Sequence, residues 1–510
     1  MLARRHWLFS LALLAGVVLR VVAMLGFRPA ILFGMDSYDY LWGAVHVSPD
    51  LVNPSGYSLF LWLLRPLHSL ALVAALQHVM GLAIAAMVYA VLRRYGLPAW
   101  GATLAALPAL IDPAQLLVET LVMADLLAMT AMVAALAVLL LRETPSLARS
   151  VTAGLLMGVS AAIRPTTLPL VLGIPLFLLA RRAGWRRAGA ALAAGALPVL
   201  GYMGWFASAH GSLNLSESNG LFLWSRTMSF ANCAVIRPPA DLRALCPTAQ
   251  GGYLSQPVPG RRPPPKRYLW SRSSWAWQHP PQGIVPDKVP FTPANNARAL
   301  RFAVRAITAQ PLAYAATVGR ETLKPFTTND RTLRFPARQT RSNTIDRPDL
   351  RYAVAAVSAY AGPGRGQAIE PYVSYHFATR LHQPFAYLMK QYQSLIFLPG
   401  PGLGLIAAAG LAGIALPRRR TAAAVFLWLS AAVIIVLPIA EHEYTYRYAI
   451  PAVPLLCIAA ALAFRRPPAP AGPAQVPAQG QAPAQAPAPP PEAAAPQQPA
   501  QGTGGGPQPG

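Results

Sequence analysis

A succession of long apolar runs, bounded by short clusters of arginine, limits this chain to one class of fold. Hydrophobic residues make up 54% of the 510 positions and charged residues only 12%, a balance too apolar for a water-soluble domain. Most of the runs are long enough to cross a bilayer. We therefore expect an all-α polytopic membrane protein with about ten transmembrane helices, in a range of about nine to twelve. The runs cover residues 7–27, 69–92, 97–111, 119–141, 150–163, 167–180, 188–207, 394–416, 421–440 and 449–464.

Arginine sets the orientation of these helices. If the N-terminus is cytoplasmic, every short arginine cluster falls on the inner side, as the positive-inside rule requires. This placement accounts for the net charge of +25 without a nucleic-acid partner. No small-residue cleavage site follows the first run, so we interpret it as a retained helix. The clusters lie at residues 4–5, 93–94, 142, 181–187, 418–420 and 465–466.

Composition divides the chain into four parts. Residues 1–207 form an N-terminal membrane module that includes a first outer loop, 27–68, and residues 394–466 form the C-terminal helices. The polar region between them, 208–393, is placed outside the cell. Residues 467–510 are rich in Pro, Ala and Gln and contain too little apolar surface to fold, so they predict a disordered cytoplasmic tail.

The outer parts carry three local signals. Residues 56–67 are apolar but too short to span, which predicts a helix at the outer surface. Residues 295–326 have helical apolar spacing, which predicts one or two amphipathic helices lying on the membrane. Cys233 and Cys246 lie in a compartment where disulfides form, so we expect a bond between them. Two unrelated thiols are the alternative.

Ionisable side chains gather at the outer ends of the predicted helices. Such groups are costly at membrane depth and are therefore candidates for function. None of them enters the orientation argument, so their common side indicates a shared outward-facing cavity. Asp36 and Asp39 lie in the first outer loop. The full set of candidates, with the tyrosines beside them, is Asp36, Asp39, Tyr40, Tyr57, Glu119, Arg164, His442 and Arg447.

Several short motifs together resemble the GT-C superfamily of membrane glycosyltransferases. The resemblance rests on their order, spacing and shared side, and it covers the membrane core from about residue 5 to residue 465. The most similar branch is the protein O-mannosyltransferase and lipid A aminoarabinose transferase type, glycosyltransferase family 39, in its actinobacterial relatives. The motifs are MDSYDY, PSGYSLFL, VETLVMADLL, AAIRPTTLPL and EYTYRYAIPAVPLL.

The resemblance implies a GT-C-type bundle and a specific chemistry in the plasma membrane. The donor would be a sugar on a polyprenyl phosphate, such as mannose or a pentose, and the acceptor a hydroxyl of a glycan, lipid or protein. Transfer with inversion needs one carboxylate as general base, and the lipid phosphate needs positive charge. The site would face the extracytoplasmic side. The resemblance leaves a divalent cation, Mg²⁺ or Mn²⁺, open as a cofactor and assigns no metal ligand.

The same resemblance distributes the roles among the candidates. Asp36 would be the general base. Arg164 and Arg447 would bind the phosphate, with His442 and Arg20 behind them. The remaining substrate-binding candidates are Asp39, Tyr40, Tyr57 and Glu119. The chain departs from the family at Ser37, where many relatives have a second acidic residue, and this puts a metal-assisted reaction in doubt.

Each assignment has an alternative, as does the function. A transporter or lipid-sugar flippase would show repeat symmetry and helices broken near the midplane, whereas this chain has a one-sided polar cluster. A non-catalytic assembly factor would tolerate replacement of Asp36. The alternatives for single residues are a helix cap at Asp36, a helix-face residue at Asp39, a helix-start charge at Glu119, a span-end anchor at Arg164 and an ion pair with Glu441 or Glu443 at Arg447.

Overall fold

The computed structural model describes residues 2–247, 263–271, 274–278, 291–329, 333–336, 379–417 and 421–465. The predicted tail, 467–510, lies outside the described residues. Within them, the regular structure is helical except for one short antiparallel pair, β1 (Phe27–Arg28) with β2 (Arg380–Leu381).

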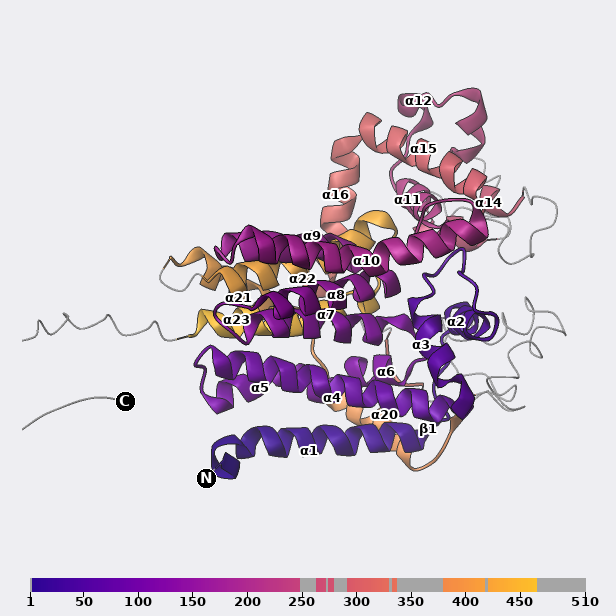
Figure 1. Ribbon diagram of the computed structural model, residues 1–510. Coiled ribbons are helices and arrows are strands. Elements are labelled where there is room, and N and C mark those ends of the chain that lie inside the picture. The colour runs from indigo at the N-terminus through magenta and orange to yellow at the C-terminus, as the bar shows by residue number, and fades with distance from the viewer. Residues whose placement is uncertain are drawn as a thin grey trace, which may run out of the picture. The chain divides into compact units, whose positions relative to one another are not determined.

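A bundle of helices with roughly parallel axes forms the membrane part of the chain (Figure 1). Large apolar side chains such as Leu197 and Leu405 are exposed on its outside, as expected of a surface that meets lipid. The helices of the bundle are α1 (Leu2–Gly26), α4 (Leu70–Arg94), α5 (Ala99–Ile111), α6 (Pro113–Thr120), α7 (Ala124–Leu140), α8 (Leu147–Ile163), α9 (Leu168–Ala180), α10 (Trp185–His210), α20 (Phe385–Leu395), α21 (Gly400–Ala415), α22 (Ala422–Glu441) and α23 (Val453–Ala463).

The helices confirm the predicted membrane fold. Among the described residues, 5 helical segments are long and apolar enough to cross a membrane, or up to 7 if each of two bent pairs is one span. The bent pairs are α5 with α6, at 48°, and α20 with α21, at 56°. Three shorter apolar helical segments coincide with the remaining predicted spans, at 124–140, 147–163 and 165–180.

Two predicted boundaries are wrong. The fourth span does not begin at Glu119, because that residue lies in α6 and a new helix, α7, begins at Ala124. Asp112 and Pro113 start α6, and the Asp112 carboxylate accepts a hydrogen bond from the Ala114 amide at 2.7 Å. Likewise, the span predicted from 394 is preceded by α20. The residues between α6 and α7, 121–123, and the first residues after α20, 396–398, are apolar, so hydropathy does not show these helix ends.

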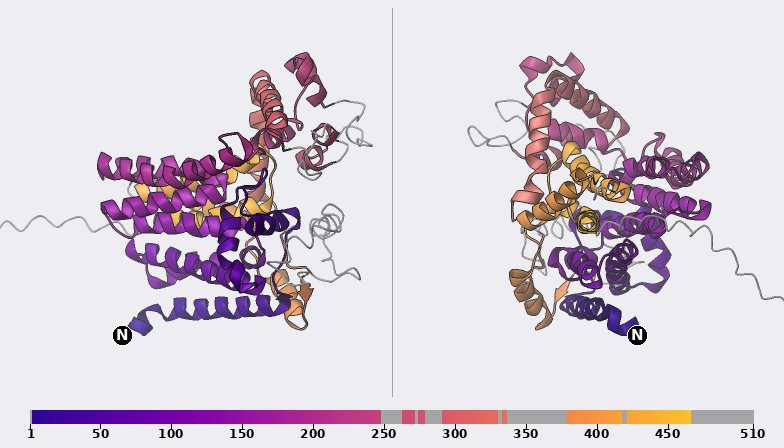
Figure 2. Two further views of the ribbon diagram at one scale, coloured as in Figure 1. Left: turned by 45° about the vertical axis from the view of Figure 1, so that its right-hand side comes forward. Right: turned by 90° about the vertical axis from the view of Figure 1, so that its left-hand side faces the viewer.

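The first outer loop is more helical than the sequence suggested. It forms α2 (Gly34–His46), which was not predicted, and α3 (Gly56–Leu64), which with the 3-10 turn η1 (Arg65–Leu67) confirms the predicted surface helix. Both α2 and α3 lie at the end of the bundle away from the N-terminus (Figures 1 and 2).

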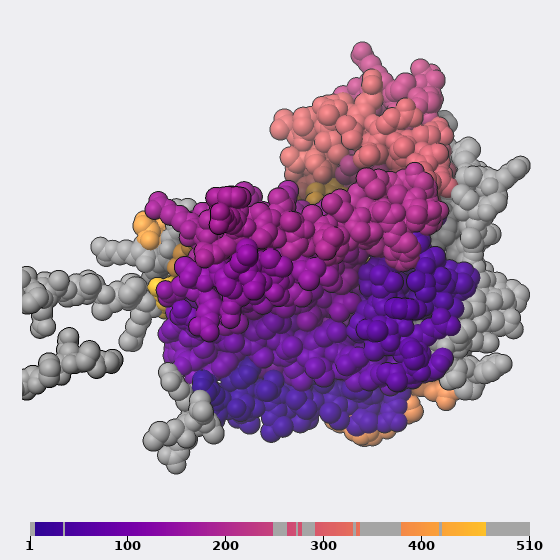
Figure 3. Space-filling model, in the orientation of Figure 1, coloured from indigo at the N-terminus to yellow at the C-terminus, as the bar shows by residue number. Residues whose placement is uncertain are grey.

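The described part of the polar region forms a second group of helices, here called the outer module. It has its own apolar core, which includes Trp224, Trp275 and Phe302, and it projects from the bundle in the space-filling view (Figure 3). The predicted disulfide between Cys233 and Cys246 is present. Two helices, α15 and α16, cover the region where one or two amphipathic helices were predicted to lie on the membrane, and the buried side of α15 packs in this core. The module consists of α11 (Asn219–Thr227), α12 (Cys233–Ile236), the 3-10 turn η3 (Ala240–Leu245), α13 (Pro265–Trp270), α14 (Trp275–Gln278), α15 (Pro293–Ala309), α16 (Pro311–Thr322) and α17 (Lys324–Thr327).

Glycines set the close packing of α8 against α10. A Cβ atom added at Gly154 would collide with the backbone oxygen of Ala191, whereas one added at Gly201, on α10, would have no heavy atom within 4 Å. A backbone neighbour cannot move aside as a flexible side chain can, so the helices themselves would have to separate.

We therefore expect Gly154→Ala to lower the free energy of unfolding by about 1–3 kcal/mol through overpacking. Gly201→Ala is the matched control and should be neutral or stabilising, because alanine favours helix over glycine. Thermal unfolding of the two purified variants in detergent would test this. Equal melting temperatures for both would contradict the packing argument.

Candidate active site

Four charged side chains from distant parts of the chain meet at the end of the bundle where α2 lies. Asp36 lies in the first turn of α2 and Asp125 in the first turn of α7. Arg164 follows α8, and Arg447 lies in the 3-10 turn η4 (Tyr446–Tyr448). The shortest pair is Arg164 Nη1 with Asp125 Oδ2, at 2.7 Å. Arg447 bridges the two carboxylates, with Nη1 at 3.3 Å from Asp36 Oδ2 and Nε at 3.7 Å from Asp125 Oδ1.

Aromatic rings enclose the two guanidinium groups. Arg447 lies 4.9 Å from the ring centroid of Phe33 and 5.4 Å from that of Tyr448. Arg164 lies 5.5 Å from the same Tyr448 ring. Ring faces attract cations and exclude water, so the charges of this cluster act over a short distance with little screening.

The two carboxylates differ in access. The Asp36 side chain is 30% exposed, whereas that of Asp125 is 2% exposed. Although Asp125 faces both guanidinium groups, neither of its oxygens accepts a hydrogen bond of normal geometry among the described residues. A reactant arriving from outside can therefore reach Asp36, while Asp125 holds the two arginines in place.

The extended residues between α6 and α7 fix Asp125 relative to Asp36. Backbone hydrogen bonds join Ile31 to this stretch, from the Ile31 amide to the Thr120 oxygen and from the Val122 amide to the Ile31 oxygen, both 3.0 Å. Ser37, which follows Asp36, donates to the Val122 oxygen at 2.7 Å. The first outer loop and the start of α7 are therefore held together as one unit.

Tyr40 and Tyr57 lie behind this unit rather than on an open surface. Both are buried, with ring centroids 5.0 Å apart in an edge-to-face arrangement. Tyr57 donates to Gln77 Oε1 at 2.7 Å, and Gln77 Nε2 donates to the backbone oxygens of Glu119 at 2.8 Å and Leu121 at 2.7 Å. Burial, with the negative charge of Asp36, raises the pKa of Tyr40. Tyr40 is therefore neutral.

Glu119 does not belong to the Asp36 cluster. It is fully buried in the bundle, where Oε1 accepts from Arg20 Nη2 at 2.7 Å and Oε2 lies 2.8 Å from His78 Nδ1. Arg20 therefore forms its ion pair with Glu119 and not with a residue of the cluster. The acid that does lie beside Arg164 and Arg447 is Asp125, which the sequence interpretation passed over. Both acids lie within VETLVMADLL. Glu119 lies in α6 and Asp125 follows the end of that helix, so the position of the helix end decides which of the two acids reaches the cluster.

His442 is also placed elsewhere. It packs against the outer module, with Nδ1 at 2.9 Å from Ser225 Oγ and its ring edge-to-face with Phe222 at 4.9 Å. Burial, assisted by the positive charges of Arg226 and Lys266, lowers the pKa of His442 to about 3. A neutral imidazole gives no charge to a phosphate, and the geometry does not bring it to the four-residue cluster.

The remaining candidates can be compared with their alternatives. Asp36 is not a helix cap, since the N-cap position of α2 is Phe33 and has no side-chain cap bond. Asp39 lies three residues after Asp36 on the same helix and is buried. Arg447 pairs with Asp36 and Asp125, as described above, rather than with Glu441 or Glu443.

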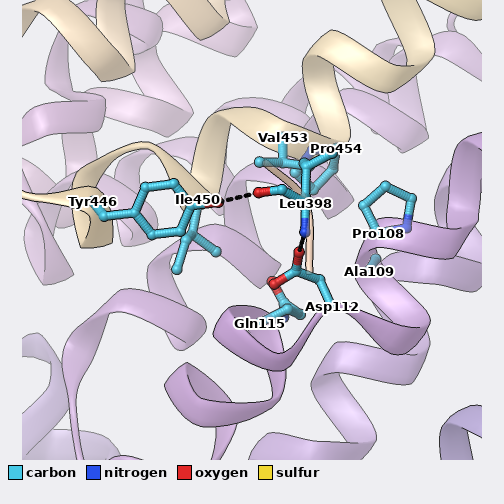
Figure 4. A pocket seen from close by; sticks show the side chains of 9 residues that line it. All are labelled: Pro108, Ala109, Asp112, Gln115, Leu398, Tyr446, Ile450, Val453 and Pro454. Carbon is cyan, nitrogen blue, oxygen red and sulfur yellow. Dashed lines mark hydrogen bonds between the residues drawn. The ribbon is translucent and has the colours of Figure 1, made fainter. Parts of the chain in front are cut away.

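A small cavity is lined in part by Tyr446, a residue of η4 (Figure 4). Its volume of about 10 Å³ has room for about one water molecule, which is too small for a sugar. On its wall, Asp112 Oδ2 accepts from the Leu398 amide at 2.7 Å and Tyr446 Oη donates to the Leu398 oxygen at 3.3 Å. It is lined by Pro108, Ala109, Asp112, Gln115, Leu398, Tyr446, Ile450, Val453 and Pro454.

The described residues contain no preformed cluster of metal-ligating side chains. Mg²⁺ and similar ions take several oxygen ligands, and the described residues contain no group of three or more His, Cys, Asp or Glu side chains that could hold a metal ion. Asp36 and Asp125 are bridged by the positive charge of Arg447 instead.

No family model matches the sequence, and neither does any curated protein. Solved structures similar to this one include the oligosaccharyltransferase of Archaeoglobus fulgidus in the apo form, at 15% identity over 90% of this chain and 50% of that chain, with a TM-score of 0.35. The same organism's oligosaccharyltransferase AglB in complex with an inhibitory peptide and a dolichol-phosphate matches at 13% identity over 91% and 50%, with a TM-score of 0.36.

ArnT from Cupriavidus metallidurans in the apo state also matches, at 14% identity over 89% of this chain and 76% of that chain, with a TM-score of 0.32. This chain spans about half the length of the oligosaccharyltransferase structures that it matches. TM-scores this low carry no argument. The fold class is therefore taken from the helices described above, and the candidate site is described from its own geometry.

The burial of His442 predicts a pH dependence of stability. The unfolded chain binds a proton at this residue near pH 6.5 and the folded chain near pH 3, so between these values the unfolded state holds more protons. The free energy of unfolding should therefore fall as the pH drops from about 6.5, by up to about 1.4 kcal/mol per pH unit from this residue. Melting curves of wild type and His442→Gln between pH 7 and pH 4 would measure it. The variant should lose less stability on acidification, and identical slopes would show that His442 is solvated.

Proposed function

We propose that this protein is a membrane glycosyltransferase that moves a sugar from a polyprenyl-phosphate donor to an acceptor hydroxyl on the extracytoplasmic side. The observation that carries the proposal is the Asp36, Asp125, Arg164 and Arg447 cluster. It combines one accessible carboxylate with two guanidinium groups oriented by a buried one. A proton acceptor beside a phosphate-binding pair is what this transfer requires.

In the proposed reaction, the acceptor oxygen attacks the anomeric carbon from the face opposite the lipid phosphate. Its proton passes to the Asp36 carboxylate, and the bond between the anomeric carbon and the phosphate oxygen breaks. The bonding pair leaves with the polyprenyl phosphate, so the configuration inverts. The accessibility of Asp36, against the burial of Asp125, supports Asp36 as the base.

Arg164 and Arg447 would bind the leaving phosphate. A planar guanidinium offers five N–H donors and matches phosphate oxygens in pairs, so an arginine that already contacts a carboxylate can still bind a phosphate. The aromatic rings of Phe33 and Tyr448 keep water from these groups. Fixed positive charge in such a place stabilises the negative charge that develops on the phosphate.

The arrangement of the chain supports a site on the extracytoplasmic side. The cluster lies at the end of the bundle where α2 is found, away from the N-terminus (Figure 1). With a cytoplasmic N-terminus and a plasma-membrane location, as the arginine clusters favour, the site faces the extracytoplasmic side. A transporter is the weaker candidate, since its polar groups would lie along a path through the bilayer.

The test is transfer of label from polyprenyl-phosphate-linked mannose and polyprenyl-phosphate-linked arabinose in membranes that contain the protein. Asp36→Asn should lower the rate by about 10²–10⁴-fold, the usual contribution of a general base. Asp125→Asn should also lower it strongly, because it leaves both arginines without their buried partner. Asp241→Asn is the matched control, since Asp241 pairs with Arg301 on the surface of the outer module, and it should keep full activity.

Normal transfer by Asp36→Asn would remove Asp36 as the base. Absence of transfer from both donors by folded wild-type protein would count against the proposed function for these two sugars and favour a transporter.

A further inference from the structure

The outer module contacts the last turn of α22 and the residues that lead from it to Arg447 at several points. Tyr314, from α16, donates to the Ala440 oxygen at 3.1 Å. Ser225 and Phe222, from α11, contact the His442 ring as described above. The Lys266 amide, from α13, donates to Glu443 Oε2 at 3.4 Å. Three helices of the module thus grip one short stretch of chain, residues 440–445.

The centre of this contact is Glu321, at the end of α16. Its Oε2 atom accepts from Arg226 Nη1 at 2.9 Å and also from the Tyr444 backbone amide at 3.2 Å. Lys324 lies 3.4 Å from the other oxygen and 6.0 Å from the Tyr444 ring centroid. A single carboxylate oxygen therefore joins α11, α16 and the stretch that leads to Arg447.

The buried Arg226 keeps the Glu321 side chain in one position. The Arg226 side chain is fully buried, and its Nε and Nη2 atoms have no hydrogen-bond partner among the described residues. A buried guanidinium without a counter-charge is strongly destabilising, so Glu321 cannot turn away from it. The Tyr444 amide, bonded to the same oxygen, is fixed as a consequence.

The arginine of the candidate site lies three residues beyond Tyr444, a reach of at most about 10 Å of extended chain. Between Tyr444 and Arg447, Tyr446 is anchored to the Leu398 oxygen. The chain that leads to Arg447 is therefore held at two points, by the outer module at Tyr444 and by the bundle at Tyr446.

We propose that the outer module positions Arg447, and that Glu321 and Arg226 are the positioning residues. They touch neither Asp36 nor Asp125 and act only through the 440–445 stretch. The effect on transfer rests on the proposed function, in which Arg447 stabilises the leaving phosphate. The mechanical link itself, from Glu321 to Tyr444, is independent of any reaction.

Three variants separate this role from a merely structural one. Glu321→Ala removes the acceptor of the Tyr444 amide but leaves Arg226 unpaired. The double variant Arg226→Met, Glu321→Leu removes the same acceptor and replaces the buried ion pair with apolar side chains, a change that proteins often tolerate in stability. Asp241→Asn, which breaks a surface ion pair of the same module, is the control.

The first measurement is amide hydrogen exchange of the peptide that contains Tyr444, on full-length protein in detergent. We expect exchange at the Tyr444 amide to be at least about tenfold faster in the double variant, with a melting temperature close to that of wild type. An unprotected amide loses the factor that its hydrogen bond contributes. Asp241→Asn should match wild type. Unchanged exchange at Tyr444 in a folded double variant would overturn the proposal.

The second measurement is steady-state transfer from the labelled donor used above. Misplacement by about 1 Å of a group that acts in the transition state costs about 10²-fold, so we expect kcat to fall by about 10–100-fold with little change in KM for the donor. A double variant with faster exchange and unchanged kcat would overturn the positioning role. If wild type transfers neither sugar, the proposed function fails for these donors, while the exchange measurement alone decides the link from Glu321 to Tyr444.

Discussion

A carboxylate that is 2% exposed must face positive charge, and Asp125 faces two guanidinium groups. Loss of either arginine would leave charge unpaired in a place with little water, at a cost of about 3–5 kcal/mol for a buried pair. The start of α7, the end of α8 and the turn η4 are therefore tied to one point. The positions of the outer ends of the bundle depend on that point.

Asp36 is tied to this arrangement by hydrogen bonds of the neighbouring backbone as well as by its ion pair with Arg447. The stretch between α6 and α7 leaves helical structure, so its amides and carbonyls need partners from elsewhere. Ile31, Gln77 and Ser37 provide them. Because Ser37 is the neighbour of Asp36, the same contact that satisfies the Val122 carbonyl also sets the distance from Asp36 to the buried acid. Ser37 therefore has a structural role in this contact.

The fold class and three members of the cluster could be predicted from the sequence, and the reasons are physical. Membrane insertion depends on local composition, so apolar runs and arginine clusters predict it. Charge at the end of an apolar run is costly, which is why Asp36, Arg164 and Arg447 stand out. Asp125 was not found. The residues 121–123 that interrupt the helix before it are apolar, and the interruption is imposed by hydrogen bonds from Ile31 and Gln77, which lie far away in the sequence. Glu119, by contrast, looked accessible but is buried against Arg20, beside Gly81, which has no side chain to fill that space.

The four side chains of the cluster differ in solvent exposure, so the site has an exposed side and a buried side. Exposure falls from 30% at Asp36 to 15% at Arg164, 13% at Arg447 and 2% at Asp125, so Asp36 faces water while the cations lie deeper. Under the proposed function, a hydroxyl acceptor that comes from the aqueous side meets Asp36 first, and a lipid phosphate in the membrane lies nearer to the arginines. Residues 440–445, which the outer module contacts, lead from the end of α22 to this deeper layer. Under the proposed positioning, a shift of the outer module would reach Arg447 through this stretch and Asp36 only through its ion pair with Arg447.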